Sequence, residues 1–156
     1  MAVKCYADAM LGKFARLARV YGIDMEYFPS TLSDNEILGM LKGGILFTSD
    51  QELCQRSPVG CVYTAQLDMV ELLYRAACLC GKGPSRCAYC NKELYILPGE
   101  SAFFPLPPKV KAYHQDFFYC PQCKKLYWKG SHWARMLKLF KEVDSKLESE
   151  GCHNRG

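Results

Sequence analysis

Two Cys-x-x-Cys pairs in the second half of the sequence constrain the fold more than any other feature. They are Cys87 with Cys90 and Cys120 with Cys123, and the 29 residues 91–119 lie between them. Two intervening residues let one tight turn direct both thiolates at one ion, and two such turns complete a tetrahedron around Zn²⁺. Pro121 and Asn91 suit such turns. Because four thiolates leave no open position for a substrate, the sequence predicts a structural zinc that stabilises a ribbon with little core of its own. The alternative is two unrelated pairs of buried or redox-active cysteines.

The other six cysteines are expected to be reduced thiols. None has the spacing of a metal ligand, the N-terminus has no apolar signal segment, and ten cysteines in 156 residues are too few for a secreted disulfide scaffold. No apolar run approaches the ~20 residues of a membrane span. We therefore expect a cytosolic protein without membrane contact, in which most of these thiols are small core residues. They are Cys5, Cys54, Cys61, Cys78, Cys80 and Cys152.

The first half of the chain alternates between strand and helix patterns. Short apolar runs typical of buried strands occupy 3–7, 25–28, 45–48 and 59–63. Helices are predicted at 10–21, 33–41, from 49–52 onward, and at 67–79. In the first helix, one apolar face carries Met10, Phe14, Leu17, Ala18 and Tyr21, and Gly22 ends the helix. Four strand–helix units predict an α/β fold with a parallel sheet flanked by helices, whose working crevice lies beyond the carboxyl ends of the strands.

The domain organisation follows from this change of pattern. We expect an α/β domain at about 1–80, a zinc ribbon with a C-terminal helix at about 84–148, and a flexible tail at 149–156. A glycine-rich linker at 81–85 joins the two parts. A proline-rich connection separates the cysteine pairs, with Pro98, Pro105, Pro107 and Pro108. The final amphipathic helix is predicted at about 132–147.

Carboxylates follow the predicted strands and therefore share one edge of the sheet. They are Asp8, Asp34, Glu36, Asp50 and Asp68. A cluster of carboxylates repels itself unless a divalent cation such as Mg²⁺ or Mn²⁺ occupies it, and such a site suits phosphodiester hydrolysis. The alternative is that these acids only cap helices, because acidic residues are common at helix starts. Glu52 and Asp68 are the weaker candidates for this reason.

The charge is unevenly distributed, and this favours a polyanion as partner. Residues 1–80 carry a net charge of −2 and residues 81–156 a net charge of +6. The first helix presents Lys13, Arg16 and Arg19, of which Lys13 is close enough to Asp8 to reach a phosphate. In the back half the basic residues Lys124, Lys125, Lys129, Arg135, Lys138 and Lys141 accompany Tyr119, Tyr127, Trp128 and Trp133. Basic and aromatic side chains together suit RNA, although the aromatics could instead cover the zinc site and His132 could be a structural residue.

Several segments together resemble the Mut-seven C-terminal RNase domain family. They are YADAMLGKFARLA from Tyr6, LSDNEIL from Leu32, ILFTSD from Ile45, SRCAYC from Ser85, PPKV from Pro107 and YCPQCKKLYWKGSHWARM from Tyr119. The resemblance implies a PIN-like nuclease fold followed by a zinc ribbon. It also implies a metal-dependent ribonuclease in which Asp8, Asp34 and Asp50 stand at the acidic positions of the site. Asn35 replaces a frequent acid of the family, and Glu52 stands where an aspartate is common.

The sequence therefore predicts a ribonuclease, a hydrolase that cleaves RNA phosphodiester bonds with Mg²⁺ or Mn²⁺ held on Asp8, Asp34 and Asp50. Glu36 or Asp68 would assist, and Lys13 would orient phosphate. Two other functions stay open at this point: a non-catalytic RNA-binding module, and an adaptor that docks another protein on the zinc ribbon. A phosphoacceptor receiver-like domain is disfavoured, because the sequence has no paired acids at the first strand and no lysine after a fifth strand.

Overall fold

The computed structural model describes residues 3–98, 116–128 and 131–152. At a few positions beside these gaps it describes the backbone alone. Several predicted features therefore lie outside the described residues. They are the proline-rich connection, Lys129, the side chains of Trp128 and His132, and residues 153–156 of the predicted tail.

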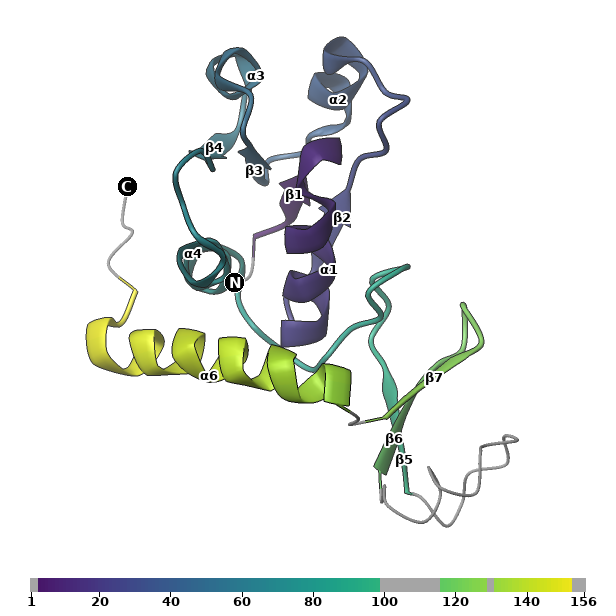
Figure 1. Ribbon diagram of the computed structural model, residues 1–156. Coiled ribbons are helices and arrows are strands. Elements are labelled where there is room, and N and C mark those ends of the chain that lie inside the picture. The colour runs from purple at the N-terminus through teal and green to yellow at the C-terminus, as the bar shows by residue number, and fades with distance from the viewer. Residues whose placement is uncertain (1–2, 99–115, 129–130, 153–156) are drawn as a thin grey trace.

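A four-stranded parallel sheet forms the centre of the first half (Figure 1). Its strands are β1 (Cys5–Ala7), β2 (Met25–Tyr27), β3 (Ile45–Thr48) and β4 (Gly60–Tyr63), in the order β2-β1-β3-β4. The connecting helices are η1 (Ala9–Leu11), α1 (Gly12–Tyr21), α2 (Asp34–Met40), α3 (Gln51–Arg56) and α4 (Met69–Cys80). The predicted alternation of strands and helices is confirmed, and the sheet is parallel throughout.

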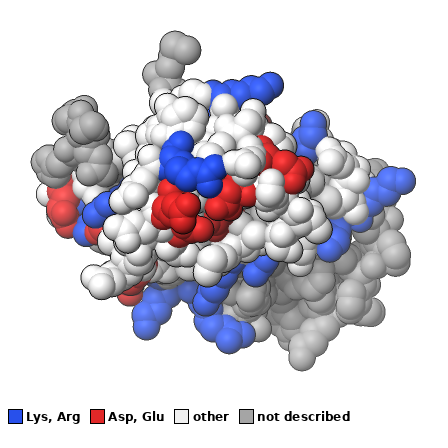
Figure 2. Space-filling model, turned by 90° about the horizontal axis from the view of Figure 1, so that it is seen from above, with Lys and Arg blue, Asp and Glu red and all other residues white. Residues whose placement is uncertain are grey.

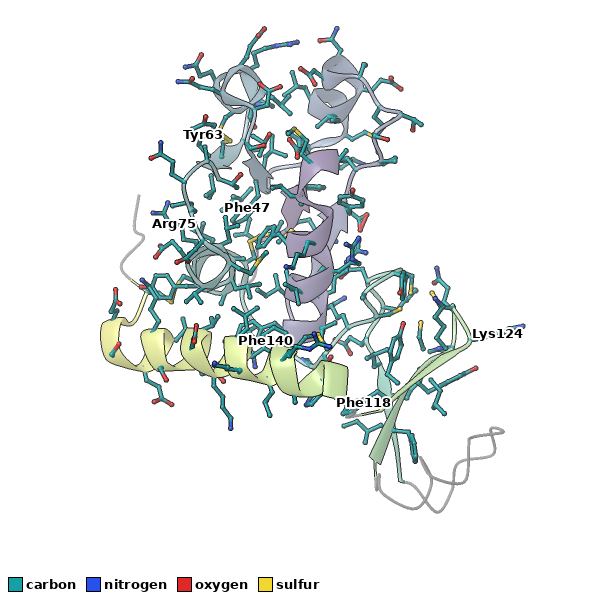
Figure 3. All side chains as sticks on the ribbon, in the orientation of Figure 1. Phe47, Tyr63, Arg75, Phe118, Lys124 and Phe140 are labelled. Atoms are coloured by element: carbon teal, nitrogen blue, oxygen red, sulfur yellow. A yellow bond between two sulfur atoms is a disulfide. The ribbon has the colours of Figure 1, made fainter. Side chains whose placement is uncertain are left out.

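Helices cover both faces of this sheet. Successive strand residues point to opposite sides, so apolar side chains on each face pack against a different pair of helices. In β1, Cys5 and Ala7 face the core shared with α1 and α4, whereas Tyr6 faces the core shared with α2 and α3. The same alternation separates Phe47 from Leu46 in β3. On the α1 side the rings of Phe14 and Phe47 pack with centroids 5.2 Å apart (Figure 3).

The back half contributes a second, antiparallel sheet and a long helix. The sheet has the order β5-β6-β7, from β5 (Tyr95–Pro98), β6 (Asp116–Cys120) and β7 (Lys125–Trp128). Helix α6 (Ser131–Glu150) then runs beneath α1 and α4 (Figure 1). Its residues Phe140 and Val143 are buried in the core of the first half, and Phe140 packs on Tyr21 with ring centroids 5.0 Å apart.

Close backbone approach joins the end of α1 to the linker. Gly22 ends the helix as predicted, with a positive φ of 113° that an L side chain rarely adopts. Its carbonyl oxygen accepts a hydrogen bond of 2.8 Å from the backbone N–H of Gly83. A Cβ atom at Gly22 would lie 2.1 Å from the Gly83 oxygen, so this position needs glycine for space as well as conformation.

Met10 departs from the prediction that it lies on the apolar face of the first helix. It is 76% exposed and belongs to the 3-10 turn η1, which precedes α1. Asp8 caps this turn by accepting a hydrogen bond from the Met10 backbone N–H. Because α1 begins only at Gly12, the helical spacing that we expected from Met10 onward does not apply to Met10.

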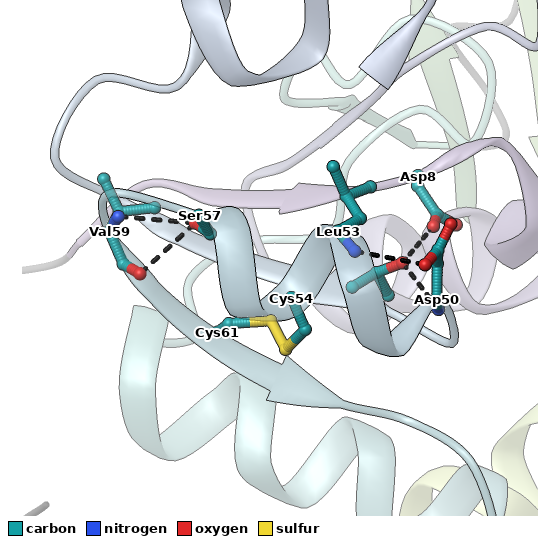
Figure 4. Close-up of a disulfide and its surroundings, with 8 residues drawn as sticks. Asp8, Asp50, Leu53, Cys54, Ser57, Val59 and Cys61 are labelled. Atoms are coloured by element: carbon teal, nitrogen blue, oxygen red, sulfur yellow. Dashed lines mark hydrogen bonds between the residues drawn. A yellow bond between two sulfur atoms is a disulfide. The ribbon is translucent and has the colours of Figure 1, made fainter. Parts of the chain in front are cut away.

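The six cysteines outside the predicted zinc site are paired, so the expectation of reduced thiols is wrong for them. The disulfides are Cys5–Cys80, Cys54–Cys61 and Cys78–Cys152. Cys54–Cys61 joins α3 to β4 (Figure 4), and the other two join α4 to β1 and to the residues after α6. Cys5 and Cys80 are also buried core residues, as expected. The pairs bring together residues 74 or 75 positions apart in two of the three cases, which spacing alone does not reveal.

Within the described ranges, no helix is long and apolar enough to cross a membrane.

Counting thiols tests the pairing. Protein unfolded in denaturant with a chelator, and without reductant, should react with a thiol reagent at only the four free cysteines that the structure contains. The remaining cysteines should react only after reduction. Reaction of all ten cysteines without reductant, in protein purified without reductant and in air, would contradict the three disulfides and restore the reduced-thiol prediction.

Candidate functional site

Two predicted acidic residues lie side by side at the carboxyl edge of the parallel sheet. Asp8 directly follows β1, and Asp50 lies two residues beyond the end of β3, its neighbour in the sheet. The chain leaves β1 for α1 on one face of the sheet and leaves β3 for α3 on the other. This divergence is the topological switch point of an open α/β sheet, where ligands bind beyond the strand ends.

The Thr48 hydroxyl connects the two acids (Figure 4). Thr48 is fully buried, donates its hydroxyl hydrogen to Asp8 Oδ2, and accepts a 3.0 Å hydrogen bond from the Asp50 backbone N–H. Asp8 is 5% exposed, and its second oxygen accepts from the Met10 N–H at 3.1 Å. Thr48 is not among the site residues predicted from the sequence. Its position at the end of a buried strand, two residues before an aspartate, is the signal that could have identified it.

Asp8 is a buried acid without a basic partner among the described residues. Burial raises the pKa of its carboxyl, the hydrogen bonds from Thr48 and Met10 oppose this rise, and the charges of Asp50 and Asp34 raise the pKa further. A group in this environment gains from a bound cation, because the cation would offset both the lost hydration and the repulsion between carboxylates.

The remaining predicted acids of this edge, Asp34, Glu36 and Asp68, lie at the starts of two helices, α2 and α4. Asp34 is half-buried in the first turn of α2, and its charge acts on Asp8. Glu36 forms the predicted capping box with Ser33, which is confirmed: Ser33 N donates to Glu36 Oε1 at 3.1 Å, and Glu36 N donates to Ser33 Oγ at 3.2 Å. The Ser33 N–H and hydroxyl lower the pKa of this exposed carboxyl. Asp68 is exposed and caps α4 by accepting from the Glu71 N–H at 2.8 Å.

The acids gather without forming a closed cage of ligands. Seen from above in Figure 2, Asp and Glu side chains group on the side of the molecule where α2 and α3 lie. Among the described residues, however, no three carboxylates have oxygens within 4.8 Å of one another. The structure thus links Asp8 and Asp50 through Thr48, and among the described residues the three predicted aspartates do not form a ready cluster around one ion.

Capping and metal binding are compatible at Asp50. It caps α3 through Oδ1, which accepts from the Leu53 N–H at 3.1 Å, and this uses one oxygen of the carboxylate. The capping alternative of the sequence analysis is thereby confirmed as a local role of Asp8, Asp50 and Asp68. A cap that uses one lone pair leaves others for a cation, so these contacts do not exclude a metal at this edge.

The four predicted cysteine ligands converge in space. Their sulfur atoms all lie within 4.8 Å of one another, with Cys90 and Cys120 3.4 Å apart and Cys87 and Cys123 3.8 Å apart. A tetrahedron built from Zn–S bonds of about 2.3 Å has an edge of about 3.8 Å, so these spacings fit one zinc ion. The cluster is able to bind a metal such as zinc, and the alternative of two unrelated pairs is wrong.

Both cysteine turns end in a residue with the left-handed backbone conformation. The residue after each pair, Asn91 in the first and Lys124 in the second, has a positive φ, 71° and 56° respectively. Asn91 suits the turn as predicted, because asparagine tolerates this left-handed conformation. Its buried side chain also accepts from the Met25 N–H at 3.3 Å and donates to Asp24 Oδ1 at 2.6 Å. Asn91 thus fixes the first turn against β2 of the parallel sheet.

Tyr127 supports the cluster from β7. Its hydroxyl lies 3.5 Å from Cys87 Sγ. Burial acts to raise the pKa of the Cys87 thiol, but the Tyr127 hydroxyl and the backbone N–H groups of Cys90 and Tyr89 outweigh it and lower this pKa to about 6. The neighbouring thiols raise the pKa of Cys123 instead. Four thiolates therefore need a cation to coexist, as a zinc site requires.

Arg19 is a structural residue rather than a surface charge, which corrects the sequence prediction. It is 7% exposed, and its Nε donates to the Met25 carbonyl at 2.8 Å. Its Nη1 donates to the carbonyls of Ala88 and Tyr89 inside the first cysteine turn, at 2.9 and 3.3 Å. The guanidinium thus joins α1, β2 and the first cysteine turn. Arg19 lies four residues after Ala15, which is also buried, so the two residues share one face of α1.

The other predicted basic and aromatic residues divide into two groups. Lys13, Arg16, Lys124, Lys125, Arg135, Lys138 and Lys141 are exposed. The aromatics are partly engaged: Trp133 stacks on Phe118 with centroids 6.0 Å apart, Tyr127 contacts Cys87, and Tyr119 is half-buried in β6. Packing within the back half, at the cysteine cluster for Tyr127 and against Phe118 for Trp133, therefore accounts for part of its aromatic content.

Zinc analysis tests the cysteine cluster. Purified protein should contain one zinc per chain, and Cys120→Ser should lose it, as measured by plasma mass spectrometry after dialysis. Tyr127→Phe, which removes only the hydroxyl beside Cys87, should keep the zinc with about 10-fold weaker affinity. Cys152→Ser is the matched control and should retain zinc. Wild-type protein without bound zinc would contradict the assignment.

The pH dependence of stability tests the environment of Asp8. In zinc-loaded protein without Mg²⁺ or Mn²⁺, Asp8→Asn should raise the free energy of unfolding at neutral pH. Burial raises the folded-state pKa, so the folded protein holds this proton more tightly and ionisation at higher pH destabilises it. The gain should be smallest below pH ~4, the ordinary pKa of aspartate, and grow as the pH rises through the folded-state pKa. Urea unfolding at several pH values measures it, with exposed Asp68→Asn as control. A gain that does not change with pH would contradict this account.

Comparison with known proteins identifies the family. The model of the Mut7-C RNAse domain matches residues 3–140, which is most of the chain. The search of curated proteins found no match, and neither did the search of solved structures. The matched range contains Asp8, Asp50 and all four clustered cysteines, so both sites described above fall within it. The chain belongs to the Mut7-C RNAse domain family.

Proposed function

We propose that this protein is a divalent-metal-dependent ribonuclease that hydrolyses RNA phosphodiester bonds beyond the ends of β1 and β3. The observation that carries the proposal is the buried Asp8, which has no ion-pair partner among the described residues and is linked through Thr48 to Asp50 at the switch point of the sheet. The family match supports a nuclease of the RNase type, with RNA as substrate. A buried carboxyl with a raised pKa is a common feature of functional sites.

Asp8, Asp50 and Asp34 would hold the catalytic Mg²⁺ or Mn²⁺. The bound ion would supply an activated water and stabilise charge on the oxygens of the phosphate. The contribution of the chain is to fix the Asp8 carboxylate and the Asp50 backbone through Thr48, and to shield Asp8 from water by burial. Lys13 is exposed near the start of α1, five residues after Asp8, and would orient the substrate phosphate. Each of Glu36 and Asp68 has a contact at a helix start, so a role for either in the reaction stays a prediction.

A PIN-like architecture is part of this proposal. Parallel strands in the order β2-β1-β3-β4, helices on both faces and acids at the carboxyl edge support it. The four cysteines would hold a structural Zn²⁺ in a zinc ribbon, whose surroundings would help to hold RNA. The division into parts at 1–80 and 84–148 and the cytosolic location also stay predictions. Of the tail predicted as flexible at 149–156, residues 149 and 150 belong to α6 and Cys152 is disulfide-bonded to Cys78, so a flexible tail stays a prediction only for residues 153–156. The disulfides weigh against a cytosolic location, because such bonds are rare in reducing compartments.

The second candidate function is a non-catalytic RNA-binding module. The observation in its favour is that Asp8, Asp50 and Asp68 each accept a hydrogen bond from a helix N–H, a role that needs no metal. Substitution by asparagine separates the two functions, because the amide oxygen caps a helix as well as a carboxylate does but is a poorer ligand for a hard cation.

Cleavage of a labelled RNA in Mn²⁺ measures the difference. Asp8→Asn and Asp50→Asn should each lower kcat/KM by at least about 100-fold, as expected for loss of a group that stabilises charge in the transition state. Glu142→Gln, an exposed acid on α6, is the control and should cleave at the wild-type rate. Unchanged cleavage by both asparagine variants would reject catalysis at this edge and leave the RNA-binding alternative.

A further inference from the structure

An open groove of about 850 Å³ runs between the two halves of the molecule. One wall is a stripe of α1, and the other consists of the first cysteine turn, β6, β7 and the start of α6. Phe118, labelled in Figure 3, lies in this wall beside the first turn of α6. The groove is separate from the sheet edge that carries Asp8 and Asp50, since neither acid lines it.

The charge of the groove is positive. Four basic residues line it, namely Lys13, Arg16, Arg86 and Arg135, and no acidic residue of the described part of the chain does. Arg86 is engaged, because it donates to the Asn91 carbonyl at 2.8 Å and lies 3.6 Å from a Glu93 oxygen. Among the described residues, no carboxylate forms an ion pair with the other three. These three charges are therefore available to an anionic ligand.

Much of the lining of the groove is apolar. It includes Leu17, Val20, Leu94, Leu126, Met136 and Leu139. Tyr89, which is 60% exposed and has Lys125 Nζ 3.7 Å from its ring centroid, adds an aromatic ring at the first cysteine turn. Basic groups beside an apolar and aromatic lining match the chemistry of an unpaired nucleic acid strand, whose phosphates are charged and whose base faces are apolar. The base faces of a duplex are stacked on one another and could not contact this lining.

The groove also leads toward the candidate active site. The α1 residues that line it are Lys13, Arg16, Leu17 and Val20, and each lies three or four positions from another of them, so they form one stripe of the helix. This stripe is about 10 Å long. Its first member, Lys13, lies one turn of chain beyond Asp8, and its last member, Val20, lies in the turn of α1 that ends at Gly22 beside the linker.

We propose that this groove binds the single-stranded part of the RNA substrate. The phosphates would contact Lys13, Arg16 and Arg135, and the bases would contact the apolar lining and Tyr89. The nuclease would then act on unpaired RNA that enters along α1. This inference rests on the proposed ribonuclease function for the identity of the ligand as substrate. The groove makes its own prediction about binding, which the following experiment measures apart from cleavage.

Binding is measured in the Asp8→Asn background, in which cleavage is not expected. The probes are a short fluorescent oligouridylate and a blunt RNA duplex of the same length, followed by anisotropy at about 50 and 200 mM salt. Arg16→Ala with Arg135→Ala should weaken oligouridylate binding by at least 10-fold and lower the salt slope by about 1.4, for two lost phosphate contacts on a single strand. Tyr89→Ala should weaken it at least about 5-fold. The duplex should bind more weakly than the oligouridylate.

The matched control is Lys138→Ala with Lys141→Ala. These lysines are exposed on the same helix as Arg135 but do not line the groove, and this pair should keep nearly wild-type affinity. Equal losses in both double variants would show a diffuse basic surface and overturn the groove. Equal affinity for duplex and single strand would overturn it as well. So would binding of a labelled acidic peptide by a protein that does not bind the oligouridylate. If oligouridylate binds as expected but wild-type protein does not cleave it in Mn²⁺, the ribonuclease proposal fails and the groove stands. If RNA is cleaved but the Arg16 and Arg135 substitutions do not change the cleavage, the groove proposal fails and the ribonuclease proposal stands.

Discussion

The parallel pairing of β1 with β3 is the constraint on which the candidate active site depends. In this ladder Ala7 lies opposite Phe47, so the chain segments that carry Asp8 and Asp50 leave the sheet at the same edge. The buried Thr48 hydroxyl then bonds the Asp8 carboxylate and the Asp50 backbone. A shift of this register by one residue would turn Thr48 to the opposite face and separate the two acids. The chemistry of the edge is thus fixed by backbone pairing in the centre of the sheet.

Much of the fold could be predicted because its signals are local. Apolar runs mark the four parallel strands, the capping box marks α2, and the cysteine spacing marks the metal cluster. The features that could not be predicted depend on distant neighbours. Arg19 is buried because β2 and the first cysteine turn meet at α1, and Cys5 pairs with a residue 75 positions away. The distance of Asp34 from the other acids depends on the path of the chain after β2, which carries no periodic pattern.

The two halves of the chain depend on each other physically. Arg19 and Asn91 fix the first cysteine turn to α1 and β2 through hydrogen bonds, and the α6 residues Phe140 and Val143 complete the core under α1. A metal that orders the cysteine turns would therefore also order one wall of the basic groove. Through this coupling, a structural zinc would influence how the proposed groove holds RNA, without any role in the chemical step.

The central claim is that Asp8 and Asp50 hold a divalent cation between them. Anomalous diffraction from crystals soaked in Mn²⁺ tests it most directly, because manganese is identified by its own scattering and distinguished from zinc by wavelength. The account predicts an anomalous peak at the carboxyl ends of β1 and β3, with oxygens of both aspartates as ligands. A well-ordered site without such a peak at saturating Mn²⁺ would contradict the account and leave these acids as helix caps.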